Sequence, residues 1–354
     1  MGLTRLWWPA GCQPAADLTV WSRVARLVWT LTFCDDLNPF GMLAGRQGRG
    51  GGVRDPDQSR GLGKAADLEE ATAVFTSVRP RLFGIAYRML SSASEAEDLV
   101  QEVWLRWQAC DRSVVDSPAA YLATTTTRLA INALSSARVR REAYIGPWLP
   151  EPVDTSADPY LGAERGEALE FAALLLMERL TPGERAAYVL REAFDYPYGQ
   201  IAGILESTEP AVRQLVSRAR KHVTGERRSP ASAAAQREFL TSFIAAARSG
   251  EMAALEKLLA ADVTSLSDGN GATRVSRRPV VGVTRVARLF SAISAWYWDG
   301  MDVRWASING QTCAVLMRDG SLSGVLTVTA SAEGIDQVLW MVNPAKLTAV
   351  PIPA

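Results

Sequence analysis

Residues suited to binding nucleic acid gather at the end of a predicted helix-turn-helix motif. Between Tyr198 and Lys221 a short apolar helix leads into a polar corner, and Thr208 is the expected N-cap of a second helix. The second helix of such a motif can enter the major groove of DNA. The residues expected to face DNA are Arg213, Gln214, Ser217, Arg218, Arg220 and Lys221. From Arg213 to Arg228 there are six basic residues and one acid, which suits contact with phosphate, although a solvated amphipathic helix is the alternative.

A second group of basic and polar residues closes an earlier predicted helix. It comprises Tyr121, Arg128, Asn132, Arg138 and Arg140. Single-stranded DNA is held by positive charge together with aromatic side chains on which bases stack, so this mixture predicts a second DNA contact. Trp104 and Trp107, by contrast, follow the spacing of a helix core, which favours packing over base stacking.

Three polar residues on a neighbouring helix favour a protein partner. Asp98, Gln101 and Glu102 share the polar face of the helix that carries Leu99 and Val103. Acidic side chains there would repel DNA. A solvated face remains the alternative to a protein-binding surface.

These residues require helical modules to position them. Residues 66–142 predict a helical bundle, with a capping box at Ser94 and Glu97 and with Ser117 as N-cap before Pro118. Residues 143–165 predict a linker, and residues 166–228 a second helical module with a capping box at Thr181 and Glu184. From 151 to 184 eight acids face two arginines, so this stretch could space two DNA-facing modules, or be an ordinary solvated linker.

Residues 232–348 change character, from helices to a run of strands. Strands are expected over 263–266, 303–308, 312–317, 324–329 and 338–342, with a helix over about 284–298. Asn309-Gly310 and Asp319-Gly320 are preferred hairpin turns. We expect an α+β domain with antiparallel strands, whose curved sheet could enclose a pocket. The predicted fold class is therefore multidomain: two all-α DNA-binding modules followed by an α+β domain.

Composition limits the remaining chemistry. The 354 residues carry 38 basic and 38 acidic side chains, so a nucleic-acid partner depends on local clusters. A single histidine and four scattered cysteines argue against a metal site, and no cofactor is expected. Separated cysteines fit a reducing cytoplasm. Residues 1–65 are expected to be a disordered or wrongly assigned extension, because their apolar run is too short for a membrane span and residues 41–63 are rich in glycine.

Several segments together resemble a known family. The stretches 81–90 and 96–107 are similar to region 2 of bacterial extracytoplasmic-function (ECF) sigma factors of the sigma-70 family, and 214–221 is similar to the end of region 4. The segments 148–152 (Trp-Leu-Pro-Glu-Pro), 268–271 (Asp-Gly-Asn-Gly) and 343–347 (Asn-Pro-Ala-Lys-Leu) resemble the SigJ-type subgroup that carries a SnoaL-like (NTF-like) C-terminal extension. The resemblance implies a transcription initiation factor that binds core RNA polymerase and promoter DNA.

The resemblance also implies roles for individual residues. Asp98, Gln101 and Glu102 match the contact with the polymerase clamp helices. Arg128, Asn132 and Arg138, with Arg140 beside them, match the reader of the minus-ten element, and the Arg213–Lys221 helix matches the reader of the minus-thirty-five element. A regulatory contact between linker and extension is implied for Trp148, Pro150, Glu151, Asp268, Gly269, Asn343, Pro344 and Lys346.

This chain departs from the family pattern at two positions. Asn270 replaces a glycine of the Asp-Gly motif, and Asn tolerates positive φ better than most residues, so the turn can survive. Ala345 replaces an acid beside Lys346.

The competing hypothesis is a DNA-binding protein whose C-terminal domain binds a small ligand or is an enzyme similar to polyketide cyclases. Such an enzyme needs a positioned acid or base. The domain offers Asp262, Asp268, Asp299 and Asp302 but no histidine, so we expect no enzyme activity, whereas a small-molecule effector stays open.

Overall fold

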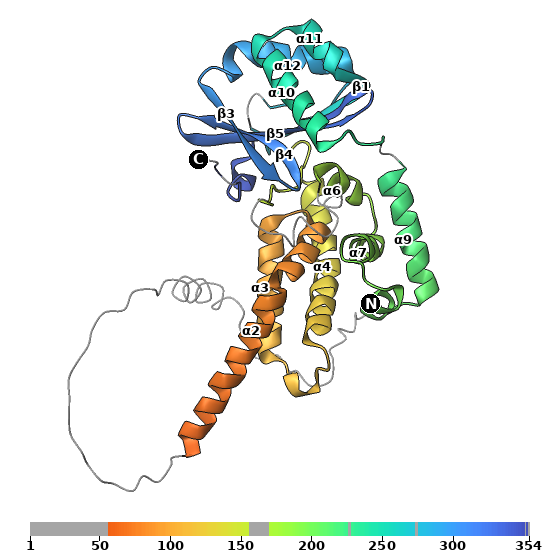
Figure 1. Ribbon diagram of the computed structural model, residues 1–354, viewed down its shortest axis with the longest axis vertical. Coiled ribbons are helices and arrows are strands. Elements are labelled where there is room, and N and C mark those ends of the chain that lie inside the picture. Colours follow the sequence, from red (N-terminus) through yellow and green to blue (C-terminus); the bar gives the residue numbers. More distant parts are fainter. Residues whose placement is uncertain (1–55, 156–169, 226–227, 273–274, 351, 353–354) are drawn as a thin grey trace, which may run out of the picture.

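The computed structural model describes residues 56–155, 170–225, 228–272, 275–350 and 352. An all-helical part, made by the first and second modules, lies beneath an α+β domain (Figure 1). This arrangement confirms the predicted fold class. None of the helices in the described ranges has both the length and the hydropathy to cross a membrane.

Three helices build the first module: α2 (Pro56–Leu90), α3 (Ala93–Ala109) and α4 (Pro118–Glu142), with the short 3-10 helix η1 (Arg112–Val114) before α4. Trp107 is 1% exposed, and its indole Nε1 donates to the carbonyl oxygen of Ala71 at 3.1 Å. Trp104 packs on Phe75, with ring centroids 4.9 Å apart. The preference for packing over base stacking is therefore confirmed for both tryptophans.

Two expectations for this module were wrong. Helix α2 begins at Pro56, so residues 56–65 are helical where a disordered extension was expected; an Asp-Pro pair at 55–56 is a typical helix start. Residues 1–55 lie outside the described residues. The N-cap of α3 is Ser92, whose hydroxyl accepts from the backbone N–H of Glu95, and not Ser94.

The second module contains α6 (Phe171–Met177), α7 (Pro182–Tyr188), the π-helix η3 (Val189–Ala193), α8 (Tyr198–Ile204) and α9 (Glu209–Thr224). The capping box of Thr181 and Glu184 is confirmed, and so is Thr208 as the N-cap of α9. The buried stripe of α9 consists of Val212, Val216, Ala219 and Val223. Ala211 and Leu215, which flank this stripe, are half-buried.

The two helical modules are not held apart. They share one hydrophobic core, which runs from Ala71 to Val223. Buried Arg185 of α7 donates from Nε to the carbonyl oxygen of Arg88 in α2 at 2.9 Å, and the Arg88 guanidinium lies 5.1 Å from the ring centroid of Phe194. The linker therefore does not keep the two modules apart, because the apolar side chains of each module pack against those of the other.

The α+β domain has three helices and a six-stranded sheet. The helices are α10 (Ala233–Ser249), α11 (Met252–Leu258) and α12 (Val283–Tyr297). The strands are β1 (Leu259–Asp268), β2 (Val280–Val281), β3 (Met301–Ile308), β4 (Gln311–Arg318), β5 (Ser321–Ser331) and β6 (Gly334–Met341), in the order β2-β1-β6-β5-β4-β3. Asn309-Gly310 and Asp319-Gly320 have positive φ at both residues, as hairpin turns of this type require. The predicted antiparallel pairing is confirmed for β3 to β6, whereas β1 pairs parallel to β6, so the sheet is mixed.

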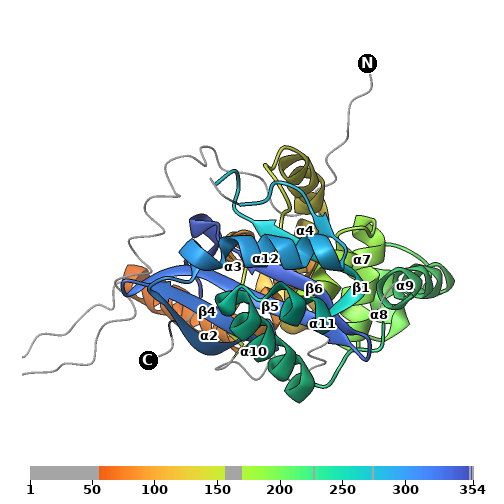
Figure 2. The same ribbon diagram turned by 90° about the horizontal axis from the view of Figure 1, so that it is seen from above.

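Each face of the sheet has its own cover. Helices α10, α11 and α12 lie over one face (Figure 2), in a core that includes Phe243, Phe290 and Trp340. The other face packs against Leu149 of the linker and Phe171 of α6. After β6 the chain forms the 3-10 helix η4 (Pro344–Lys346), and Leu347 adds to the second core. The sheet is thus in direct contact with the linker and the second module.

Candidate functional sites

The predicted DNA-facing residues of α9 are all exposed. Arg213, Gln214, Ser217, Arg218, Arg220 and Lys221 lie on the side opposite the buried stripe. Three of them form surface ion pairs: Arg213 with Glu209 at 2.5 Å, Arg218 with Glu184 at 2.9 Å and Arg220 with Glu192 at 2.7 Å. The Arg213–Glu209 pair is exposed on both sides and so contributes about 0–1 kcal/mol. Glu184 and Glu192 are largely buried, but the side chains of all three arginines are about half exposed and therefore accessible to phosphate.

On α4, Asn132 and Arg140 are exposed, and Arg140 pairs with Glu95 at 2.5 Å. Tyr121, which was grouped with them, packs against Trp107 with ring centroids 5.7 Å apart. The backbone of Arg138 is helical, but its side chain lies outside the described residues.

Arg128 is differently placed, because it reaches from α4 to the helix-turn-helix. Its Nε donates to the carbonyl oxygen of Ile204 at 3.0 Å, and a terminal nitrogen donates to that of Gly203 at 3.2 Å. The same guanidinium pairs with Glu206 in the turn at 3.0 Å. Arg128 thus caps the C-terminal end of α8, where backbone carbonyls need donors.

Asp98, Gln101 and Glu102 lie exposed along α3, opposite its buried Leu99 and Val103. Glu102 also pairs with Arg106 one turn later, at 2.6 Å. The polar face therefore exists as expected.

The motifs of the linker and the extension meet at Asp268, the last residue of β1. Its carboxylate is 0% exposed and accepts three hydrogen bonds: from the Tyr144 hydroxyl at 2.5 Å, the Leu149 backbone N–H at 2.8 Å and Lys346 Nζ at 2.7 Å. Asn343 Nδ2 donates to the Tyr144 hydroxyl at 2.7 Å. We call Asp268, Tyr144, Asn343 and Lys346 the Asp268 cluster.

Lys346 is the cation of this cluster. Its side chain is 6% exposed, and Nζ also donates to the carbonyl oxygen of Leu149 at 2.5 Å and lies 4.0 Å from the ring centroid of Trp148. Burial lowers the pKa of Lys346 to about 8, although the Asp268 carboxylate favours the charged form. Burial and the bond to Asp268 raise the pKa of Tyr144, so its hydroxyl keeps its proton. The residue after Asn343, Pro344, begins η4, and Ala345 donates its N–H to the Asn343 side chain at 3.1 Å.

The Asp-Gly turn that follows Asp268 packs closely. A Cβ added at Gly269 would lie 2.9 Å from Val275 Cγ1, so glycine is needed there for space. Asn270 has φ of 45°, which confirms that Asn supports this turn. Gly271 faces Ile145 of the linker.

A second contact joins α2, the linker and the extension. The Tyr87 hydroxyl donates to the carbonyl oxygen of Glu151 at 2.6 Å and accepts from Asn309 Nδ2 at 2.6 Å. Asn309 also exchanges backbone and side-chain bonds with Val153, at 3.0 and 2.9 Å. The Glu151 carboxylate accepts from the Ser92 hydroxyl at 2.9 Å and from the Ser94 N–H at 3.0 Å, and Pro150 before it is buried.

Of the eight residues predicted to be regulatory, the structure joins Trp148, Asp268, Asn343 and Lys346 around Tyr144. It joins Glu151 to Tyr87 and, through Tyr87, to Asn309. Sequence analysis placed Asn309 only in a turn and Tyr87 only within the stretch 81–90. No spacing signal connects Tyr87 with Asn309, since they are 222 positions apart in the chain.

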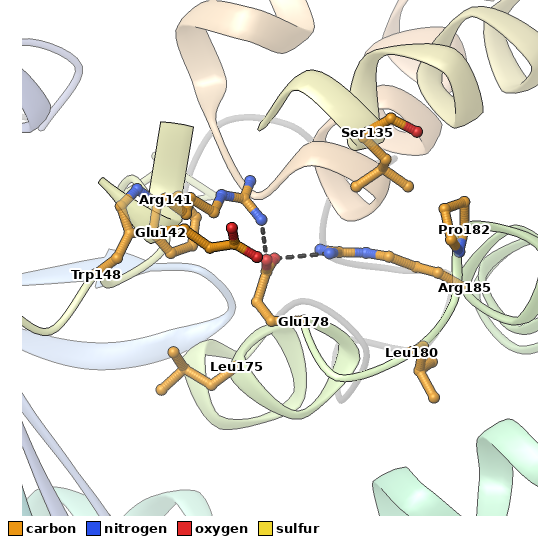
Figure 3. A pocket seen from close by; sticks show the side chains of 10 residues that line it. Ser135, Arg141, Glu142, Trp148, Leu175, Glu178, Leu180, Pro182 and Arg185 are labelled. Carbon is orange, nitrogen blue, oxygen red and sulfur yellow. Dashed lines mark hydrogen bonds and ion pairs between the residues drawn. The ribbon is translucent and has the colours of Figure 1, made fainter. Parts of the chain in front are cut away.

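A cavity of about 590 Å³ lies beside this junction, between the end of α4, the linker and α6–α7. Figure 3 shows Glu178 on its wall between two arginines. Glu178 pairs with Arg185 at 2.6 Å and with Arg141, whose guanidinium stacks 3.9 Å from the ring centroid of Trp148. Burial lowers the pKa of Arg141 to about 9.

The interior of the α+β domain is filled by aromatic rings. Trp340 contacts Phe290, with centroids 6.0 Å apart, and Tyr297, with centroids 4.7 Å apart, and its Nε1 donates to the Tyr297 hydroxyl at 3.1 Å. Phe243 lies 4.8 Å from Phe290.

The four candidate acids of this domain lie elsewhere. Asp262, Asp299 and Asp302 are exposed, and Asp268 is held in its cluster. In the described residues, no group of three or more metal-binding side chains comes together.

Comparison with known proteins connects these parts. Sigma-70 region 2 matches residues 74–140, and sigma-70 region 4 matches residues 170–223. The chain is 36% identical to the ECF RNA polymerase sigma factor SigJ of Mycobacterium tuberculosis (strain ATCC 25618 / H37Rv) over 295 residues, which cover 78% of this chain and 93% of SigJ. The chain belongs to the ECF RNA polymerase sigma factors.

A further relative and a solved structure agree with this assignment. A probable ECF sigma factor, SigI of M. tuberculosis (strain CDC 1551 / Oshkosh), is 29% identical over 283 residues, covering 79% of this sigma factor and 95% of SigI. The crystal structure of M. tuberculosis SigJ superimposes with a TM-score of 0.63 at 32% identity, covering 80% of this chain and all of SigJ. The match extends the resemblance to the C-terminal domain. As an ECF sigma factor, the protein is a transcription initiation factor.

Proposed function

We propose that this sigma factor binds core RNA polymerase, directs it to promoters with two spaced elements, and is regulated by its C-terminal domain. The observation that carries the proposal is the pair of sigma-70 regions, each of which presents exposed polar and basic residues on the helix where DNA or polymerase contact is expected. The proposed division is 66–142 for region 2, 143–165 for the linker, 166–228 for region 4 and 232–348 for the SnoaL-like domain.

Each exposed surface has a proposed role. Asp98, Gln101 and Glu102 on α3 would bind the polymerase clamp. Asn132, Arg138 and Arg140 on α4 would contact the minus-ten element, and the exposed residues of α9 the minus-thirty-five element. Arg128, whose side chain is 45% exposed, would join the minus-ten contact from its place at the end of α8.

The C-terminal domain would act through the linker. The Asp268 cluster and the Tyr87–Asn309 contact hold residues 144–153 between the sheet and α2. Any change in the domain that displaces Asp268 or Asn309 therefore alters the linker that joins the two modules. No catalysis by the domain is proposed, because the described candidate acids are outside its aromatic interior.

Run-off transcription with core polymerase tests this function. We expect transcripts from a discrete set of DNA fragments only when the full chain is present. Transcription that does not depend on the chain refutes the proposal.

A charge reversal tests the polymerase surface. Asp98→Lys with Glu102→Lys should abolish association with core polymerase, because both side chains lie on the same exposed face. Glu69→Lys with Glu70→Lys on α2 is the matched control, since it makes the same charge change at exposed acids outside that face. Equal losses in the two variants would contradict the assignment of this face.

A further inference from the structure

One segment of the C-terminal domain contains basic residues but no acidic ones. Between Asp268 and Asp299 the sequence has no acidic residue and five arginines. Four of these are described with their side chains: Arg277 and Arg278 in the loop between β1 and β2, and Arg285 and Arg288 on α12. We call these four the arginine face. Neither the sigma regions nor the linker motifs account for it.

All four side chains point to solvent. Arg285 and Arg288 are three residues apart and so share one side of α12, while the opposite side buries Val286, Ala287, Phe290 and Ile293. No carboxylate in the described ranges comes within ion-pair distance of any of the four. The arginines of α9 and Arg228 differ in this respect, because they are paired with acids.

The arginine face begins next to region 2. A Cβ added at Gly146 would lie 3.5 Å from Arg277 Cα, so the linker backbone and the arginine loop are in contact. Gly146 follows the last residue of α4, Glu142, by four positions, and Arg140 lies in the last turn of that helix. The loop therefore lies beside the linker, which follows the basic end of the helix proposed to contact the minus-ten element.

We propose that the arginine face binds the phosphate backbone of promoter DNA, so that the C-terminal domain is itself a DNA-binding element. Unpaired guanidinium groups of a single sign attract a polyanion, and neutralising phosphates releases condensed counterions. Contact of this kind reads no sequence but positions the protein on the duplex. An acidic protein surface would satisfy the same charges, but contact with the linker beside α4 favours DNA.

This inference rests on the proposed function, since it requires promoter complexes. The test uses the full chain with core polymerase and a promoter duplex identified by run-off transcription. Binding is measured by fluorescence anisotropy over a series of salt concentrations. Arg285→Gln with Arg288→Gln should lower the slope of log K against log salt by about two units, because each lost phosphate contact removes about 0.9.

The control removes the same charge from another face of the domain. Arg237→Gln with Lys257→Gln changes two exposed residues on α10 and α11 and should leave the slope as in the wild type. The inference is overturned if the two double variants have equal slopes, whether changed or not. Failure of the wild type to bind any fragment with core polymerase would instead overturn the proposed function.

Cross-linking identifies what the face contacts. Exposed Thr284 is replaced by a photoreactive residue in the same complex. A cross-link to DNA supports the proposal, whereas a cross-link only to a polymerase subunit shows that the partner is a protein.

Discussion

Replacing Asp268 by Asn tests whether the Asp268 cluster holds the linker. The carboxylate lies among three donors: the Tyr144 hydroxyl, the Leu149 N–H and Lys346 Nζ. The Asn side chain carries an N–H₂ donor in place of one carboxylate oxygen, so this donor must face one of the three donors. The Tyr144 oxygen is already used as an acceptor, by Asn343. The change also leaves the Lys346 ammonium, whose side chain is 6% exposed, without its counterion.

Removing one partner of a buried ion pair costs about 3–5 kcal/mol, which is roughly a hundredfold to a few thousandfold in an equilibrium constant. We therefore expect Asp268→Asn to lower the free energy of unfolding by about this amount in urea titrations of the full chain. It should also make residues 143–155 more susceptible to limited proteolysis, because Leu149 loses its bond to β1.

Asp299→Asn is the matched control, since Asp299 is exposed in the same domain. Surface changes of this kind usually stay within about 0.5 kcal/mol. If Asp268→Asn unfolds like Asp299→Asn and its linker resists protease equally, the cluster does not hold the linker.

Four further outcomes are expected. Burial lowers the pKa of Lys346 to about 8 from an unfolded value of 10.5, so the unfolded chain binds more protons than the folded chain between these pH values. The free energy of unfolding should therefore rise with pH in that window by about 1 kcal/mol per pH unit. Lys346→Met should lack this rise, and parallel curves for the two proteins in urea titrations would contradict the reasoning. Thr181→Ala removes the capping box of α7 and should cost about 1 kcal/mol of unfolding free energy, so an unchanged urea midpoint would count against the cap. Trp107→Ala should cost about 3–5 kcal/mol in the same assay, unless the cavity is refilled by its neighbours. Arg218→Glu with Lys221→Glu should weaken promoter binding and lower its salt slope by about one unit per lost phosphate contact, and an unchanged slope in anisotropy would remove α9 from the DNA interface.

The local features of this fold could be predicted from sequence because their causes are local. Thr181 with Glu184 and Thr208 are caps formed within one helical turn, and Asn309-Gly310 forms its hairpin from its own backbone preferences. Ser94 with Glu97 has the spacing of a capping box, but Ser92 with Glu95 has the same spacing. The linker decides between them, since the Glu151 carboxylate binds the Ser94 N–H and the Ser92 hydroxyl.

The long-range contacts could not be predicted from periodicity or spacing. Arg128 is of a residue type that often contacts DNA. The residues next to it in the sequence do not indicate that it caps α8, 75 positions away. The parallel pairing of β1 with β6 likewise depends on how the helices cover the sheet. For the junction, motif resemblance named Asp268 and Lys346 as regulatory, whereas only the structure shows that they form a buried pair.

The contacts of Tyr87 connect the position of the C-terminal domain with that of the linker and region 2. Its hydroxyl, on α2, binds both the linker, at the Glu151 carbonyl, and the extension, at Asn309. Burial raises the pKa of Tyr87, so the hydroxyl remains a donor to Glu151 while it accepts from Asn309. A displacement of Asn309 would leave a buried polar group without its partner, which costs about 1–3 kcal/mol, and this penalty couples the position of the extension to that of the linker on region 2.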